Sequence, residues 1–183
     1  MRKAILLLTG GTSKRMGKDK AFLTIKNESF LNQWKDCDVR YLSDNILNKH
    51  HIEGYDLILD EYNDIGPING IVSCFHQTDV DTLFVVACDM PYMTKDVMNV
   101  LYDCLESYDG IFLKDKDHLY SLGGVYTRKM LPIMEQQIVD KQYSLYQIIR
   151  KCNVRIIDVD TMDIDKNTLM NINTIEEYKT FPE

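Results

Sequence analysis

The sequence lacks the features that mark secreted, membrane-spanning or low-complexity proteins. Its five cysteines are an odd number and form no Cys-x-x-Cys pair, which argues against a disulfide framework and against a zinc site. No apolar run approaches the roughly 18–20 residues that a helix needs to cross a bilayer. Internal repeats and Pro/Gly/Ser-rich linkers are also missing. We therefore expect a single domain over residues 1–183, located in the cytoplasm.

The chain also has no excess of positive charge. Its formal net charge is −7, which argues against a surface that binds nucleic acid or an anionic membrane. Four of its 21 basic residues nevertheless fall within residues 14–20, where about one is expected by chance. These four are Lys14, Arg15, Lys18 and Lys20. A local basic patch on an acidic protein predicts a small anionic ligand.

Short apolar runs alternate with amphipathic stretches along the chain. Six runs are expected to be strands, at residues 4–8, 39–42, 57–59, 83–87, 122–126 and 155–159. The first run is too short to be the apolar part of a signal peptide. Helices are expected to begin at Thr94, Ser144 and Thr174, which are suitable N-cap residues. The pattern predicts an α/β domain with a mainly parallel sheet, whose ligands bind at the carboxyl ends of the strands.

A glycine-rich, basic loop from Leu8 to Lys20 follows the first expected strand. Gly10 and Gly11 allow a sharp turn and a close backbone approach, so that N–H groups can surround a phosphate. Arg15 and Lys20 can add charge-assisted contacts to the same group. The alternative is a tight Gly-Gly turn with an ordinary solvated basic face.

Two better-known phosphate loops do not fit this segment. The Walker pattern requires a glycine where Thr12 stands and Ser or Thr where Asp19 stands, and the dinucleotide fingerprint Gly-x-Gly-x-x-Gly is absent. The segment instead resembles the loop of nucleotidyltransferases built on a Rossmann-like sheet. Their pattern is a small residue, Gly-Gly, a short spacer, Arg-Met-Gly and a lysine three residues on. It is matched here by Thr9-Gly10-Gly11, Arg15-Met16-Gly17 and Lys20.

The Asp-Lys ending at residues 19–20 is most similar to that of the molybdenum cofactor guanylyltransferases. One mild departure is Thr9, where that family usually has alanine. The resemblance covers nearly the whole chain, because further landmarks follow in the family's order. It implies a three-layer, Rossmann-like α/β nucleotidyltransferase domain with a mainly parallel, mixed central sheet.

Two of these landmarks are carboxylates that follow expected strands. Asp60 and then Gly66-Pro67 resemble the family's segment near the base and ribose, and Pro67 suits the first turn of a helix, whose amino end favours an anion. A Gly-Pro turn that merely starts a core helix is the alternative. Asp89 comes just after the strand expected at residues 83–87 and resembles the family's magnesium ligand. A single carboxylate suits Mg²⁺, which takes only one or two protein carboxylates besides phosphate oxygens. A capping or turn aspartate is the alternative there.

The acceptor side is expected near the end of the chain. Asn171-Ile172-Asn173-Thr174 resembles the family's Asn-Val-Asn-Thr element, which is implied in holding the pterin. The amides of Asn171 and Asn173 can serve pterin donors and acceptors together, although an Asx turn or helix cap is the alternative. Ser43 aligns with a polar nucleotide contact, and Asp44 or Asn45 could take that role instead.

Single aromatic and imidazole side chains carry weaker signals. Trp34 is expected in the core rather than as a platform for a stacked base. His50, His51 and His76 lack metal-ligand spacing and are expected at the surface. His118 lies near the expected substrate strand and is interpreted as structural.

The resemblance implies an enzyme that transfers GMP from GTP to the phosphate of molybdopterin and releases pyrophosphate. The implied cofactor is Mg²⁺ on Asp89, with Arg15 and Lys20 stabilising phosphate charge. Molybdoenzyme-specific delivery proteins are candidate partners. Two other classes stay open: a cytidylyltransferase acting on molybdopterin, a terpenoid precursor or a sugar phosphate, and a non-catalytic module that delivers nucleotide or cofactor. The expected nucleotide contacts are Leu8, Thr9, Gly10, Gly11, Lys20, Ser43, Asp60, Gly66, Pro67 and Asp89.

Overall fold

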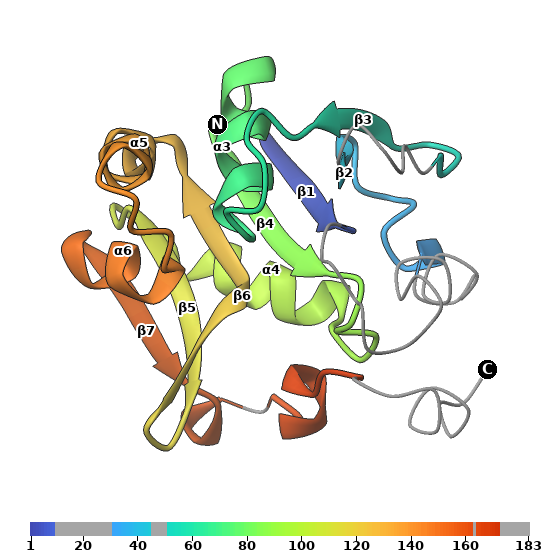
Figure 1. Cartoon of the computed structure of the whole chain (residues 1–183). Coiled ribbons are helices and arrows are strands. Elements are labelled where there is room, and N and C mark those ends of the chain that lie inside the picture. The colour runs from blue at the N-terminus through green and yellow to red at the C-terminus, as the bar shows by residue number, and fades with distance from the viewer. Residues whose placement is uncertain (10–30, 45–50, 163, 173–183) are drawn as a thin grey trace.

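A seven-stranded sheet runs through the part of the chain that the structure describes, which comprises residues 1–9, 31–44, 51–162 and 164–172 (Figure 1). The structure is a computed structural model, and its strand order is β3-β2-β1-β4-β6-β5-β7. The strands are β1 (Lys3–Leu8), β2 (Arg40–Asp44), β3 (Asp56–Leu59), β4 (Thr82–Ala87), β5 (Gly110–Asp115), β6 (His118–Thr127) and β7 (Val154–Asp158). The helices are α3 (Ile68–Gln77), α4 (Lys95–Asp103), α5 (Leu131–Val139) and α6 (Leu145–Lys151), with the short 3-10 helices η1 (Arg128–Met130), η2 (Val159–Thr161) and η3 (Lys166–Leu169).

The sheet is mixed but mainly parallel. β1 pairs in parallel with β2 and β4, β2 with β3, and β5 with β7, whereas β6 runs antiparallel to both of its neighbours. The predicted α/β class and Rossmann-like architecture are therefore confirmed. All six expected strands are present, and the strand expected at residues 122–126 extends over the whole of β6. β5 and α5 were not expected from the sequence.

Helices cover both faces of the sheet and give the domain its three layers (Figure 1). Side chains alternate between the two faces along β1: Ile5 and Leu7 pack in the core beneath α4, and Leu6 packs in the core beneath α3, α5 and α6. Trp34 is fully buried on the α4 side, with its ring centroid 5.8 Å from that of Phe84. Its expected place in the core is confirmed.

The starts of two predicted helices are where the sequence placed them. Thr94 is the N-cap of α4, and its hydroxyl accepts a hydrogen bond from the Val97 amide at 3.4 Å. Ser144 is the N-cap of α6, although no hydrogen bond from its side chain caps the helix. The helix expected after Thr174 lies outside the described residues.

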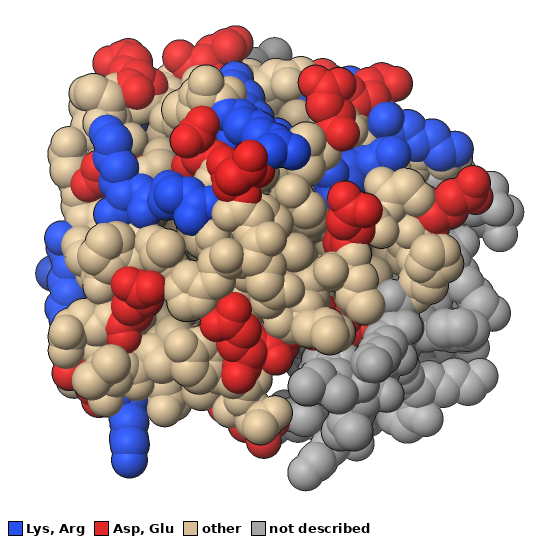
Figure 2. Space-filling view, turned by 90° about the horizontal axis from the view of Figure 1, so that it is seen from above, with Lys and Arg blue, Asp and Glu red and all other residues tan. Residues whose placement is uncertain are grey.

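Charge is mixed on the face seen in Figure 2, where lysine and arginine side chains are interspersed with aspartate and glutamate. No single-sign patch forms on that face among the residues drawn in colour. In the described part of the chain, no helix is long and apolar enough to cross a membrane. All five cysteines are free thiols.

Candidate functional site

Four parallel strands end side by side at one edge of the sheet. The last residue of β1, Leu8, is level with Ser43 of β2 and with Ala87 of β4, and the end of β2 is level with Leu59 of β3. Residues that immediately follow these strands therefore emerge at the same edge. This topology brings the segments at residues 9, 60 and 88–89 together, as expected from the sequence.

The entry to the basic loop is held from both sides at this edge. The backbone amide and the hydroxyl of Thr9 both donate to the Ser43 carbonyl, at 3.1 and 2.8 Å, and Cys88 donates its amide to the Leu8 carbonyl at 3.0 Å. Thr9 is 4% exposed, so its hydroxyl anchors the strand end where the family's usual alanine has no such group. Gly10, Gly11, Arg15 and Lys20 lie outside the described residues.

Asp60 is supported by the end of β2. The Ser43 hydroxyl donates to Asp60 Oδ1 at 2.7 Å, and the Asp60 amide donates to the Asp44 carbonyl at 3.0 Å. Burial raises the pKa of the Asp60 carboxyl above its ordinary value. The hydrogen bond from Ser43 lowers this pKa, and the nearby charge of Asp44 raises it further. The Ser43 side chain is 2% exposed, so the structure gives it a supporting place beneath Asp60 instead of an open position at the edge. Asp44 is also buried, and Asn45 lies outside the described residues.

α3 packs closely against this support. A Cβ atom at Gly70 would lie 2.2 Å from Ser43 Oγ and 2.7 Å from Leu8 Cδ2. The absent side chain therefore lets the helix approach both strand ends. At the helix start, Gly66 has φ +75°, and its carbonyl accepts the Asn69 amide at 3.1 Å. Pro67 is the N-cap, so the expected helix start after Gly-Pro is confirmed.

Gly70→Ala is expected to lower the free energy of unfolding by about 1–3 kcal/mol, because the new methyl group overlaps Ser43 and Leu8. Urea unfolding measures the change. Adding Ser43→Ala removes the closest clashing atom, so the double variant should lose less stability than the sum of the two single losses. Strict additivity would show that Gly70 and Ser43 are not packed as described.

Asp89 lies beside the last described part of the chain. It follows β4 by two residues, it is half-buried, and its backbone carbonyl accepts the Ile172 amide at 2.8 Å. Asn171 is exposed next to this contact, and Asn173 lies outside the described residues. The structure thus brings Asp89, the residue expected to hold the metal, next to the segment expected to hold the acceptor. Within the described ranges, no three His, Cys, Asp or Glu side chains form a group that could hold a metal ion by themselves.

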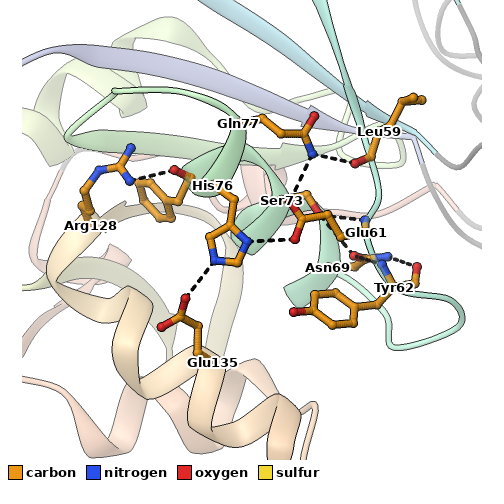
Figure 3. A network of polar contacts seen from close by, with 10 residues as sticks. Leu59, Glu61, Tyr62, Asn69, Ser73, His76, Gln77, Arg128 and Glu135 are labelled. Carbon is orange, nitrogen blue, oxygen red and sulfur yellow. Dashed lines mark hydrogen bonds and ion pairs between the residues drawn. The ribbon is translucent and has the colours of Figure 1, made fainter.

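His76 bridges two glutamates beyond this edge, which the sequence did not predict. His76 lies at the surface, as expected, but its Nδ1 lies 2.8 Å from Glu61 and its Nε2 lies 2.8 Å from Glu135 of α5 (Figure 3). The hydrogen bond with Glu61 raises the pKa of His76, burial lowers it by a smaller amount, and Glu135 raises it further. Both contacts join residues far apart in sequence, so no local pattern could reveal them.

The His76 bridge should make stability depend on pH. Because the folded-state pKa lies above the ordinary value of 6.5, the contribution is complete below about pH 6.5 and is lost as the pH rises through the folded-state pKa. The carboxylates are partly exposed, so the effect should be only about 0.2–1 kcal/mol. We expect wild type to exceed His76→Gln in unfolding free energy at pH 6 and the difference to shrink at pH 8.5. His51→Gln, at an exposed site, is the control, and a difference that grows with pH would contradict the bridge.

Three features together define the class of Rossmann-like nucleotidyltransferase domains: a mainly parallel sheet, a basic glycine-rich loop after its first strand and a carboxylate after β4. The family model for the MobA-like NTP transferase domain matches residues 5–156. The chain belongs to this family.

Known proteins similar to the chain agree with the family. A Clostridium perfringens (strain 13) protein named "Probable molybdenum cofactor guanylyltransferase" is 29% identical over 98% of this chain and 96% of its own length. The solved structure of molybdopterin-guanine dinucleotide biosynthesis protein A from Archaeoglobus fulgidus is 21% identical, covers 96% of this chain and 95% of its own, and has a TM-score of 0.74. The 2-C-methyl-D-erythritol 4-phosphate cytidylyltransferase of Thermus thermophilus is 8% identical, with 98% and 96% coverage and a TM-score of 0.65. The two structures show the shared fold.

Proposed function

We propose that this enzyme transfers GMP from GTP to molybdopterin, forming the guanine dinucleotide cofactor and pyrophosphate. The observation that carries the proposal is the meeting of Asp89 with the Asn171–Ile172 segment at the carboxyl edge of the sheet. That edge also holds Asp60 and the entry to the basic loop. A donor nucleotide and a pterin acceptor would therefore meet at one carboxylate. The names of the relatives support the same reading.

Each part of the edge has a role in the proposed reaction. The acceptor phosphate attacks the α-phosphorus of GTP in line, and the bond to pyrophosphate breaks. Backbone N–H groups of the loop at Gly10 and Gly11, with Arg15 and Lys20, would hold the triphosphate and stabilise the charge that grows on the leaving pyrophosphate. No general base is needed, because the acceptor phosphate is already largely ionised near neutral pH.

Other residues of the edge would bind the nucleoside, the acceptor and the metal. Asp60 and Gly66-Pro67 would contact the ribose and base, and Asn171 and Asn173 the pterin. Asp89 fits Mg²⁺, which takes one or two protein carboxylates and completes its ligands with phosphate oxygens and water. When bound, Mg²⁺ would supply charge neutralisation between the two anionic substrates.

Two other functions are compatible with the fold. A cytidylyltransferase is one, since the Thermus thermophilus enzyme named above has a similar fold. A module that only delivers nucleotide or cofactor is the other, and the presence of Lys20 and Asp89 together argues against it. The test is pyrophosphate release from GTP with Mg²⁺, with and without molybdopterin. Release that requires molybdopterin supports guanylyl transfer, and binding without release in either case would favour the delivery module.

The surroundings of the proposed reaction follow from its chemistry. We place the enzyme in the cytoplasm, where five free thiols suit the reducing conditions. A protein that passes the finished cofactor to a molybdoenzyme is the expected partner. Pull-down with a molybdoenzyme-specific delivery protein tests that partner directly.

A further inference from the structure

The loop from Asp60 to Gly66 is tied to α3 by buried polar side chains (Figure 3). The side-chain amide of Asn69 makes two hydrogen bonds with the backbone of Tyr62: Oδ1 accepts from the Tyr62 amide at 3.1 Å, and Nδ2 donates to the Tyr62 carbonyl. One turn later, Ser73 Oγ accepts the Glu61 backbone amide at 3.0 Å and donates to Asn69 Oδ1 at 3.2 Å. The two side chains thereby fix the backbone of the two residues that follow Asp60.

Polar side chains such as those of Asn69 and Ser73 are unusual on the face of a helix that packs against the core. Asn69 is 4% exposed and Ser73 is fully buried, in a helix whose neighbouring residues Ile68, Ile71 and Val72 are buried and apolar. An apolar residue would fill the same space without the need for partners, and a buried amide that loses its partners costs about 1–3 kcal/mol. The hydrogen bonds to Glu61 and Tyr62 are therefore the specific contribution of these two residues.

The loop needs such restraint because its backbone is not in a common conformation. Asp64 has φ +56°, and Gly66 has φ +75°, so two of its seven residues lie in the left-handed region. Without fixed contacts, a connection of this kind can adopt other conformations. Asp60 itself is held on its other side by Ser43 and by the Asp44 carbonyl.

We propose that Asn69 is a positioning residue for nucleotide binding, which holds the Asp60 carboxylate and the Gly66-Pro67 turn in place before the nucleotide arrives. The assignment rests on the proposed function, in which Asp60 and Gly66-Pro67 contact the nucleotide. A loop that is already ordered need not be ordered by the ligand. The effect of Asn69 therefore lies on the affinity for nucleotide and not on the chemical step.

The experiment compares the KM and kcat of Asn69→Ala, Asn69→Asp and Gln137→Ala with those of wild type, using GTP, Mg²⁺ and molybdopterin. For Asn69→Ala we expect KM for GTP to rise about 10-fold and kcat to stay within about twofold of wild type. Gln137 is a buried amide on α5, 1% exposed and outside this loop's hydrogen bonds. Gln137→Ala should lower the unfolding temperature but leave KM unchanged.

Asn69→Asp gives a readout that a general loss of stability would not. The new carboxylate can still accept from the Tyr62 amide, but it faces the Tyr62 carbonyl with no proton to donate. Lowering the pH protonates the carboxylate and restores the donor. The ratio of the KM of Asn69→Asp to the KM of wild type at the same pH should therefore fall towards 1 as the pH is lowered. The same ratio for Asn69→Ala should not change.

Each result decides the assignment. A folded Asn69→Ala with the wild-type KM would overturn it, as would a Gln137→Ala that raises KM equally. If Asn69→Ala does not fold, Ser73→Ala removes the hydrogen bonds of Ser73 with Glu61 and Asn69 but keeps both contacts of Asn69 with Tyr62. It should raise KM about threefold, and an unchanged KM would again overturn the assignment. Failure of the proposed function is recognised separately, because wild type itself would then release no pyrophosphate from GTP in the presence of molybdopterin.

Discussion

Asp89→Asn is expected to lower kcat at least about 100-fold while leaving the fold intact. An amide oxygen is a much poorer ligand for Mg²⁺ than a carboxylate, and losing a preorganised charge contact to the reacting phosphates costs about 2.7–4 kcal/mol. The fold should survive because Asp89 is only half-buried and contacts Ile172 through its backbone carbonyl, which the substitution keeps.

Turnover is measured across a Mg²⁺ titration, with circular dichroism as the check on folding. Asp96→Asn is the matched control, since Asp96 is an exposed carboxylate in the first turn of α4. It should retain the wild-type rate. An Asp89→Asn enzyme that turns over at the wild-type rate in limiting Mg²⁺ would remove Asp89 from the metal site.

Lys20→Ala is expected to weaken GTP binding about 10- to 100-fold, and Lys14→Ala should have far less effect. Lys20 matches the family's phosphate contact, and a lost charge-assisted hydrogen bond costs about 1.5–3 kcal/mol. Isothermal titration with GTP and Mg²⁺ measures both variants under the same conditions.

The two lysines are matched in charge and lie in the same loop, so each serves as the control for the other. Net charge and general electrostatic attraction change equally in both variants. Equal and small losses would show that the loop acts as a diffuse basic patch and makes no specific phosphate contact.

Much of the fold could be predicted because the central strands are covered on both faces. β1 and β4 appear in the sequence as uninterrupted apolar runs, and their parallel pairing agrees with the mainly parallel sheet that the α/β pattern predicts. β5 was missed, although its apolar run from Ile111 to Leu113 is as long as the run at residues 57–59 that was expected to be a strand. Its pairing with β6 and β7 on both sides makes it a strand, and that is a long-range property.

The candidate site also has features that the sequence predicts and features that it does not. The meeting of Thr9, Asp60 and Asp89 at one edge follows from the rule that parallel strands end together, so it was predictable. The supporting role of Ser43 beneath Asp60 was not, because it depends on the close approach of Gly70 in α3. The contacts of α3 with Glu61 and Tyr62 were invisible for the same reason: they join a helix to the loop before it through side-chain geometry.

The base of the nucleotide is the point on which the central claim depends. Guanine has an acceptor at O6 and donors at N1 and N2, and adenine reverses the pattern at positions 6 and 1. A site of backbone groups arranged for guanine leaves buried groups unpaired when adenine enters, at about 1–3 kcal/mol for each group. Cytosine would also leave part of a purine-sized site empty.

Competition binding of GTP, CTP and ATP at fixed Mg²⁺, followed by product analysis with molybdopterin, tests the account most directly. If the protein is a guanylyltransferase, GTP should bind at least about 10-fold more tightly than either competitor. Each GMP attached to the pterin should release one pyrophosphate. CTP that binds as tightly as GTP and yields cytidylylated pterin would contradict guanylyl transfer and assign the protein to the cytidylyltransferases.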